Sequence, residues 1–377
     1  MLTNIKLQTI VIMYPKRKQK YGQVIMTKSL MTQTGEAGTD FWNDSCDLEQ
    51  LSEALEHGAV GATSNPVIVL STVKSNPELW NPVIDELVSK NPHAAEDDIA
   101  WMLTSKIGVK AAELLLPVFE NSHGRKGRLS LQVNPKFFKD ADAMLAQAVE
   151  LNKIAPNIAI KMPVVKDALE AMGKATALGI VVTPTVCFSV AQAVAAAEAI
   201  ERGLKQAEAN GIDTSSMKPN VAIMVGRLDD HLKLVMETEK ISVDPGVLEW
   251  AGVAVFKRAY KIFKERGFKS ILLAAAYRNH MQWSEFIGGE VAVSIPYKWW
   301  KRFNASNIEV VSKIDKQVCE KTIKTLEENF VDFRRAYEPD GMSTEDFVSF
   351  GASIRTLKQF INAYHELLGI IRERMIR

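Results

Sequence analysis

The chain has 377 residues, of which 47% are hydrophobic and 24% charged, so it can bury a sizeable core and has neither a disordered nor a collagen-like composition. Its 46 Lys and Arg offset 45 Asp and Glu to a formal net charge of +1, which excludes a global basic field for nucleic acid or an anionic membrane. Three widely spaced cysteines form no disulfide framework or zinc pattern, and no apolar stretch reaches the roughly 18 residues of a membrane span, so we expect a cytoplasmic protein.

Short apolar, β-branched runs alternate with longer segments of helical period from Thr39 onward. The eight runs lie near residues 41–44, 60–63, 129–133, 158–161, 180–185, 221–225, 270–274 and 291–295. Eight parallel strands joined by crossover helices close into a (β/α)8 or TIM barrel, which is an α/β fold. We therefore predict one barrel domain over residues 39–377, preceded by a loosely ordered extension over residues 1–38.

The intervening helices carry recognisable start signals. Asp47 is expected to cap a helix over residues 48–56, and Ser189 to cap a helix over residues 190–203. Residues 76–127, between the second and third runs, exceed what a minimal barrel requires and are expected to form a helical insertion. Residues 317–375, which follow the eighth run, are expected to hold helices that cover the barrel. The last of these is expected over residues 343–375, opened by Ser343 with Asp346 three residues on.

Polar residues at the carboxyl ends of the strands are the candidate catalytic groups, because catalytic side chains of barrels lie there. The fourth run ends on Lys161, followed by Pro163. This lysine either extends its amine to solvent or presents a desolvated nucleophile, with a lowered pKa, that forms a Schiff base with a carbonyl. The first run ends on Asp44, which is either a general acid/base or a helix cap.

Amides and hydroxyls follow three further runs. Thr63 and Asn65 lie in Thr-Ser-Asn-Pro after the second run, where Asn65 either meets a ligand hydroxyl or forms a plain Asn-Pro turn. Gln132 ends the third run, and Thr183 and Thr185 end the fifth. These side chains either orient a water or a hydroxyl, or are interior polar groups that find partners within the protein.

Two arginines follow the sixth and seventh runs. Arg227 and Arg278 can make planar, bidentate hydrogen bonds to phosphate, and loops after late strands are frequent phosphate sites in barrels. The alternative for each is a salt bridge, with Asp229 or Asp230 as the partner of Arg227. The six histidines show no spacing of a metal triad, and no glycine-rich phosphate loop is present, so we expect neither a metal nor a nucleotide cofactor.

Taken together, the order and spacing of these motifs from about residue 40 to residue 300 resemble the transaldolase family. The motifs are Asp44, Thr63-Ser-Asn-Pro66, Ile160-Lys-Met-Pro163, Thr185 with Phe188-Ser189, Val225-Gly-Arg227 and Tyr277-Arg-Asn279. The resemblance implies a class I mechanism on a (β/α)8 barrel, without metal or organic cofactor. It also implies a reaction of the non-oxidative pentose phosphate pathway, in which a dihydroxyacetone unit moves between sugar phosphates.

The resemblance also implies residue roles. Lys161 would form the Schiff base, and Asp44 would take the proton from the C4 hydroxyl of the donor. Asn65 would hold the dihydroxyacetone hydroxyls, and Thr185 would position the catalytic water. The residues that would grip the phosphate are Arg227 and Arg278, and the remaining residues of the expected substrate site are Thr63, Thr183 and Asn279.

Four positions depart from the family pattern. Gln132 stands where well-studied transaldolases have a glutamate, and a neutral amide can orient water but cannot take its proton. The related fructose-6-phosphate aldolases resemble this chain at Gln132 but have a tyrosine where it has Met224. Thr183 and Ala222 replace an asparagine and a serine that contact the dihydroxyacetone moiety. The alternatives to a transaldolase are therefore a class I aldolase and a non-catalytic sugar-phosphate-binding barrel, and the acceptor and any homo-oligomeric state stay open.

Overall fold

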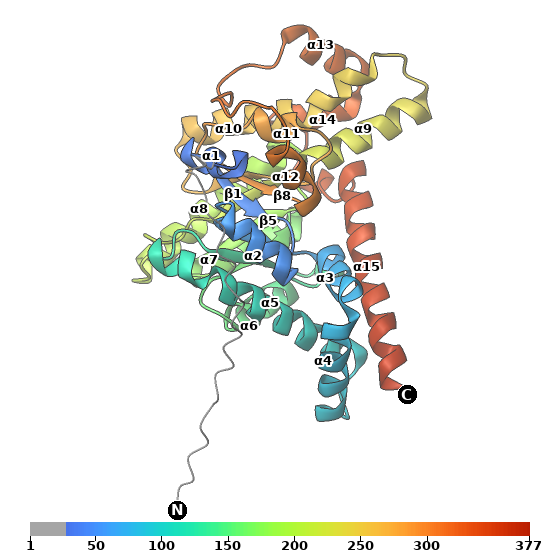
Figure 1. Cartoon of the computed structure of the whole chain (residues 1–377). Coiled ribbons are helices and arrows are strands. Elements are labelled where there is room, and N and C mark those ends of the chain that lie inside the picture. Colours follow the sequence, from blue (N-terminus) through green and yellow to red (C-terminus); the bar gives the residue numbers. More distant parts are fainter. Residues whose placement is uncertain (1–27) are drawn as a thin grey trace, which may run out of the picture.

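A computed structural model describes residues 28–377 of the chain. Its centre is one eight-stranded parallel sheet with the strand order β5-β4-β3-β2-β1-β8-β7-β6. The ends of the sheet, β5 and β6, meet through a bridge between Cys187 and Ile223. The sheet is thus a nearly closed barrel surrounded by helices, which confirms the predicted (β/α)8 fold (Figure 1). The strands are β1 Asp40–Asn43, β2 Gly61–Thr63, β3 Arg128–Gln132, β4 Ile158–Pro163, β5 Val182–Thr185, β6 Asn220–Ile223, β7 Ile271–Ala274 and β8 Ala292–Ile295.

The helices begin largely where the sequence signals place them. Asp47 Oδ1 accepts a hydrogen bond from the Gln50 amide at 3.0 Å, and Ser189 Oγ accepts one from the Gln192 amide at 3.0 Å, as expected of helix caps. The helix after Ser189 runs to Ala209, six residues beyond the predicted end. None of the helices within residues 28–377 combines the length and apolar character needed to cross a membrane. The helices are α1 Leu30–Glu36, α2 Leu48–Glu56, α3 Pro66–Ser75, α4 Pro77–Lys90, α5 Glu96–Asn121, η1 Pro135–Phe137, α6 Ala141–Asn152, α7 Lys166–Ala177, α8 Val190–Ala209, α9 Val225–Glu239, η2 Pro245–Trp250, α10 Ala251–Arg266, α11 Met281–Ser284, α12 Tyr297–Asn304, α13 Glu320–Asn329, α14 Val331–Tyr337, η3 Thr344–Asp346 and α15 Gly351–Met375.

The boundary of the N-terminal extension needs correction. The extension was predicted to run to residue 38, yet α1 already packs on the barrel, with Met31 fully buried. The Thr34 hydroxyl accepts a hydrogen bond from the indole of Trp283 at 3.0 Å. Burial of one apolar face is what holds so short a helix in place. The rest of the predicted extension, residues 1–27, lies outside the described residues.

The interior of the barrel is filled by a small core of its own, separate from the larger core beneath the helices. Trp42 of β1 belongs to this inner core, and it fits because its neighbour on β2 is Gly61. A Cβ added at Gly61 would lie 2.4 Å from the Trp42 ring, closer than side chains can approach. The pairing of a large and a small residue therefore fills the base of the barrel beneath the strand ends.

We expect Gly61→Ala to destabilise the protein by about 1–3 kcal/mol, the usual cost of overpacking a filled core. The measurement is the free energy of unfolding in urea. The matched control is Gly369→Ala in the interior of α15, where an added Cβ meets nothing within 4 Å. There the substitution should be neutral or stabilising, since alanine is the better helix former. Equal effects at the two positions would contradict the packing explanation.

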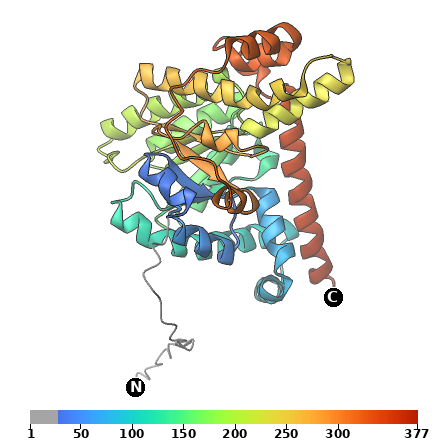
Figure 2. The ribbon, with the colours of Figure 1, turned by 45° about the horizontal axis from the view of Figure 1, so that its top comes forward.

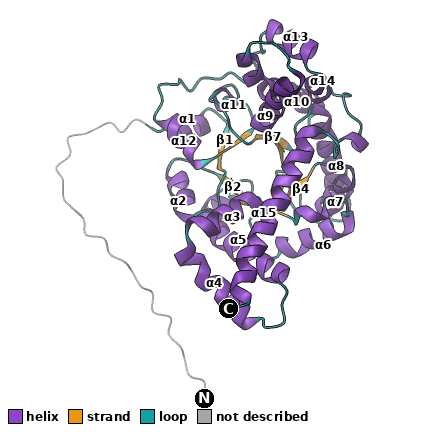
Figure 3. Cartoon of the chain, turned by 90° about the vertical axis from the view of Figure 1, so that its right-hand side faces the viewer, coloured by secondary structure: helices purple, strands orange, loops and turns teal. Residues whose placement is uncertain are grey.

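The two additions to the barrel are helical, as predicted. The insertion between β2 and β3 contains α4 and α5, and the segment after β8 contains α13, α14 and α15. The long α15 packs against α3, α5 and η1. Of these, α3 follows β2, α5 precedes β3, and η1 follows β3. Figure 3 shows this helix lying across the ring of strands, and Figure 2 shows it running along one side of the molecule to the C-terminus. α15 therefore covers part of the mouth of the barrel at the carboxyl ends of the strands.

The start of the last helix differs from the prediction. Asp346 Oδ2 accepts hydrogen bonds from the amide and hydroxyl of Ser343, but this box closes only the short η3. α15 begins at Gly351, after Phe350 has turned into the core against His231, with ring centroids 5.5 Å apart. A Cβ at Gly351 would lie 2.3 Å from the His231 ring. The break is therefore set by tertiary packing rather than by the capping signal.

Candidate active site

Lys161 lies in the middle of the candidate site. It is in β4 between Ile160 and Met162, and its side chain is almost fully buried, with 3% exposed. The Nζ atom donates to the backbone carbonyl of Ser64 at 3.2 Å. Burial lowers the pKa of Lys161, and the nearby Asp44 carboxylate opposes that shift. A buried amine with a lowered pKa is suited to attack a carbonyl, since its neutral form is the nucleophile.

The register of the sheet places two other predicted residues beside Lys161. Gln132 of β3 lies opposite Lys161, and Lys161 lies opposite Thr183 of β5. The Thr183 hydroxyl bonds to Ser130 Oγ at 2.8 Å, so it is already satisfied within the protein. Gln132 differs, because neither its amide oxygen nor its amide nitrogen has a partner within residues 28–377 although both are buried. A buried amide in this condition is suited to bind a water or a ligand hydroxyl.

Asp44 follows β1 and is half-buried in the same mouth. Its Oδ1 accepts from the Thr63 hydroxyl at 2.6 Å, and that hydroxyl also lies 2.6 Å from Ser294 Oγ of β8. Burial raises the pKa of Asp44, while Lys161 and the Thr63 hydrogen bond oppose the shift. Because Asp47 is the residue that caps α2, the cap interpretation of Asp44 does not hold. Asp44 is therefore a carboxyl group whose Oδ1 is hydrogen-bonded to Thr63 and which lies close enough to Lys161 for the two charges to interact.

The two remaining amide and hydroxyl candidates, Asn65 and Thr185, differ in the hydrogen bonds they make within the protein. Asn65 Oδ1 accepts from the amides of Val67 and Ile68 at 2.9 and 3.1 Å, so it caps α3 instead of forming only an Asn-Pro turn. Whether the Asn65 amide nitrogen binds a substrate hydroxyl stays a prediction. The Thr185 hydroxyl contacts the sulfur of Met224 at 3.9 Å, a weak acceptor.

Arg227 enters the mouth from the start of α9. Its guanidinium lies against α15, where Nη1 donates to Thr356 Oγ1 at 3.3 Å and to Gln359. Burial, together with the nearby Arg278 and Arg355, lowers the pKa of Arg227 to about 10. Its Nε is buried without a partner in the part of the chain that the structure describes. No carboxylate pairs with it there, so the salt bridge to Asp229 or Asp230, the alternative to a phosphate contact, is absent from the described residues.

Asp230 instead pairs with Arg278. Arg278 Nε and Nη2 donate to the Asp230 carboxylate at 2.7 to 3.0 Å, the bidentate geometry expected of an arginine and a carboxylate. For Arg278 the salt-bridge alternative is therefore present in this structure, at an exposed position. The adjacent Asp229 is fully buried and accepts from the Gly252 amide and from Gln282 Nε2 at 2.8 and 2.6 Å. Burial raises the pKa of Asp229 to about 8.

Asn279 makes contacts of a structural kind. Its Oδ1 accepts from the Met281 amide at 2.9 Å, and its Nδ2 donates to Glu249 Oε2 at 2.6 Å. The side chain thus ties the loop after β7 to η2. The prediction that Asn279 binds substrate finds no free hydrogen-bonding group to support it in this geometry.

The comparison with protein families addresses the whole barrel. The model of the transaldolase/fructose-6-phosphate aldolase family matches residues 41–369. The chain belongs to this family. The match extends past the motifs at residues 40–300 and includes residues 351–369 of α15, so most of the helix across the mouth is part of the family region.

Several curated transaldolases are similar to this member of the family. It is 28% identical to "Transaldolase" of Saccharopolyspora erythraea over 63% of this chain and 66% of that protein. It is 30% identical to "Transaldolase" of Mycolicibacterium smegmatis over 61% and 63%, and 26% identical to "Transaldolase" of Mycobacterium leprae over 86% and 84%. The chain spans just under two thirds of the length of the first of these relatives.

Five residues at the mouth of this transaldolase-family barrel were not among the predicted site residues. Ser294 faces inward from β8, and its signal was a polar residue in an otherwise apolar strand. Ser64 supplies the carbonyl that meets Lys161. Thr356, Gln359 and Arg355 come from α15, about 130 residues after Arg227, and no local pattern marks them.

Proposed function

We propose that this protein is a transaldolase that moves a dihydroxyacetone unit between sugar phosphates through a Schiff base on Lys161. The observation that carries the proposal is the buried Lys161 amine, which shares the mouth of the barrel with the Asp44 carboxylate and lies close enough to Arg227 for the charges to act on each other. The donor and acceptor pairs are those that the family implies: sedoheptulose 7-phosphate with glyceraldehyde 3-phosphate, and fructose 6-phosphate with erythrose 4-phosphate.

The chemistry follows from these groups. The neutral Lys161 amine adds to the C2 carbonyl of the ketose phosphate, and the carbinolamine loses one water to give an imine. Asp44 accepts the proton of the C4 hydroxyl as the C3–C4 bond breaks, and the bonding electrons pass into the imine to give an enamine. An aldose phosphate leaves. The enamine then attacks the acceptor aldehyde, and the same steps in reverse release the new ketose phosphate and the free amine.

A class I aldolase is the second candidate, and the neutral Gln132 amide is the observation that favours it. The two activities differ only in whether an aldose or a proton captures the enamine. The deciding experiment incubates the protein with fructose 6-phosphate, with and without erythrose 4-phosphate, and follows glyceraldehyde 3-phosphate and free dihydroxyacetone. Release of glyceraldehyde 3-phosphate that depends on the acceptor identifies a transferase, and dihydroxyacetone without acceptor identifies an aldolase. If neither product forms, the remaining candidate is a non-catalytic sugar-phosphate-binding barrel.

Gln132→Glu tests the water site beside Lys161. We expect the variant to keep or raise transferase activity and to shift the pH dependence of kcat. The reason is that glutamate, unlike glutamine, places an ionisable group at the water site beside Lys161. The matched control is Gln147→Glu on α6, whose Oε1 accepts from the Asn134 amide outside the barrel. A folded but inactive Gln132→Glu protein, with an active control, would show that the water assignment is mistaken.

Arg227→Ala tests the phosphate site. Charge-assisted arginine bonds contribute roughly 1.5–3 kcal/mol, so KM for fructose 6-phosphate should rise about ten- to a hundredfold while unphosphorylated donors lose far less. Arg278→Ala should act in the same direction. Lysine should not fully restore either site, since an ammonium lacks the planar fork.

Arg258→Ala is the control for both arginine variants, because Arg258 pairs with Glu338 at 2.7 Å, away from the mouth. Equal losses for phosphorylated and unphosphorylated donors would contradict the phosphate assignment. Such a result would mean that Arg227 serves mainly to hold α15 through Thr356 and Gln359.

A further inference from the structure

A small cavity lies beside the candidate site, behind Gln132. It is lined by the loop after β2, the first turns of α3, the end of β3, α5 and α15. The volume open to the centre of a water molecule is about 10 Å³, which is close to the space that one buried water needs. The cavity is therefore large enough for a single water and too small for a substrate.

Three buried polar atoms on the wall of this cavity lack partners within the described part of the chain. They are Ser64 Oγ and both amide atoms of Gln132. The two residues are 0% and 3% exposed. Leaving a buried donor or acceptor without a hydrogen-bond partner is destabilising, so such atoms are usually satisfied by the protein or by an ordered water. A water placed among these atoms can donate to Ser64 or Gln132 and accept from the amide, which meets the two to four partners that a buried water requires.

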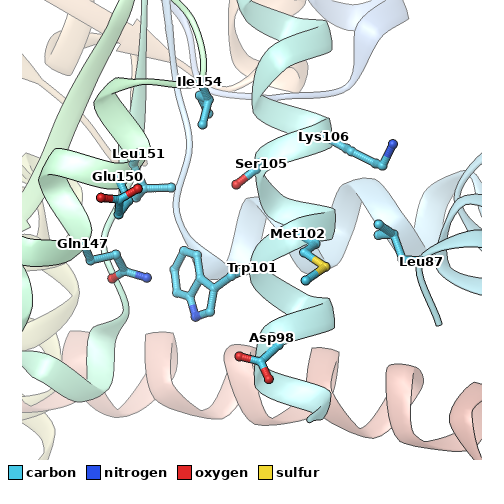
Figure 4. A pocket seen from close by; sticks show the side chains of 10 residues that line it. All are labelled: Leu87, Asp98, Trp101, Met102, Ser105, Lys106, Gln147, Glu150, Leu151 and Ile154. Carbon is cyan, nitrogen blue, oxygen red and sulfur yellow. The ribbon is translucent and has the colours of Figure 1, made fainter. Parts of the chain in front are cut away.

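Trp101 of α5 is the one residue that lines both this cavity and an open groove on the surface. The groove has a volume of about 580 Å³ and lies between α5 and α6. Figure 4 shows the indole of Trp101 extending from α5 toward Gln147 of α6. The indole of Trp101 thus lies between the groove and the space behind Gln132.

The indole is held in place from the other side by α15. Its ring lies 5.8 Å from the ring of Tyr364, and the Tyr364 hydroxyl donates to Asp97 Oδ1 at 2.7 Å. The same carboxylate oxygen accepts from Lys136 Nζ at 2.8 Å. Trp101 is only partly buried, but it packs against the ring of Tyr364, whose hydroxyl is itself held by Asp97.

We propose that Trp101 closes a water route from the surface groove to the Gln132 amide, and that it thereby determines whether the enzyme transfers or hydrolyses its covalent intermediate. This inference rests on the proposed function, because only a Schiff-base mechanism makes water a reactant at Lys161. α15 covers part of the mouth and the bound substrate would occupy more of it, so a side route would give water access to the adduct while the site is filled.

The water balance of the reaction explains why such a route matters. Imine formation expels one water from the carbinolamine. In hydrolysis the enamine carbon takes up a proton to give the imine, and one water then adds its oxygen to the imine carbon. The C–N bond breaks, the nitrogen takes the proton, and dihydroxyacetone and the free Lys161 amine are released. Restricting that incoming water prolongs the life of the enamine and favours transfer to an aldose.

The test measures the lifetime of the adduct directly. The protein is loaded with fructose 6-phosphate, freed of donor and product by rapid gel filtration, and sampled with borohydride to count the adduct that remains. Trp101→Ala should speed adduct decay in buffer several-fold while leaving discharge by erythrose 4-phosphate nearly unchanged. Met102→Ala is the matched control, since Met102 lines the groove but not the cavity.

A second variant keeps the proposal testable if Trp101→Ala fails to fold. Thr104 lines the cavity, and its hydroxyl bonds only to Ala100 of the same helix at 2.8 Å. Thr104→Ile fills the space from inside and should slow adduct decay. Decay rates equal to wild type in the folded variants would overturn the water route. Absence of any trapped adduct in the wild-type protein would instead overturn the proposed function.

Discussion

Borohydride reduction in the presence of fructose 6-phosphate should trap a stable adduct on Lys161, and Lys161→Ala should lose both the adduct and several orders of magnitude in turnover. Reduction converts the imine to a secondary amine that cannot be hydrolysed, so the site of attack is recorded covalently. Lys161 is the lysine whose buried amine faces the barrel mouth with a lowered pKa. Peptide mass analysis after digestion identifies the modified residue.

Two nearby lysines provide the control for this experiment. Lys166 and Lys174 on α7 are exposed and paired with Glu345 and Glu170. These ion pairs raise the pKa of both amines, which keeps them protonated and poor nucleophiles. Lys166→Ala and Lys174→Ala should therefore retain the adduct and turnover. An adduct mapped to either of them, or turnover without any adduct, would refute the assignment of Lys161.

Asp44→Asn should still form the imine but cleave the carbon–carbon bond at least about 10²-fold more slowly, the usual size of a general-base contribution. The amide keeps the shape of the side chain and can still contact Thr63, but it cannot accept the proton of the C4 hydroxyl. Borohydride trapping should therefore still detect the adduct, while the release of glyceraldehyde 3-phosphate from fructose 6-phosphate should fall. The two measurements are made on the same preparation.

Asp47→Asn is the matched control, three residues along the chain. Asparagine caps helices about as well as aspartate, so the bond to the Gln50 amide and the activity should both survive. Nearly wild-type turnover in Asp44→Asn would show that Asp44 is not the base.

The pKa shifts of Asp44 and Lys161 predict the direction of the pH dependence of activity. Asp44 must be a carboxylate to accept a proton, and burial raises its pKa, so activity should fall as the pH drops through that raised value. Lys161 must be neutral to attack, and its pKa is lowered by burial, so the rate of imine formation should rise with pH earlier than for an ordinary lysine. Because the Asp44 charge raises the pKa of Lys161, Asp44→Asn should extend imine formation to still lower pH.

The sequence by itself determined the barrel and the positions of its candidate catalytic residues at the strand ends. Alternating apolar runs and helical segments predicted eight parallel strands, and the caps Asp47 and Ser189 marked where helices begin, because caps and periodicity are local properties. Lys161 and Asp44 could be predicted to share a site because a closed parallel barrel brings all carboxyl strand ends to one face. The same rule placed Gln132 at the end of the third strand, whereas its position directly opposite Lys161 comes from the register of the structure.

Only the tertiary structure decided which partner each polar group takes. Asp230 pairs with Arg278 rather than Arg227, although both arginines lie near it. Asn279 is bound to Glu249, thirty residues earlier, and Arg227 meets Thr356 on α15. These contacts join residues far apart in the chain and depend on how loops and α15 pack, which no local period or cap encodes. The start of α15 has the same cause, since burial of Phe350 overrides the capping box at Ser343.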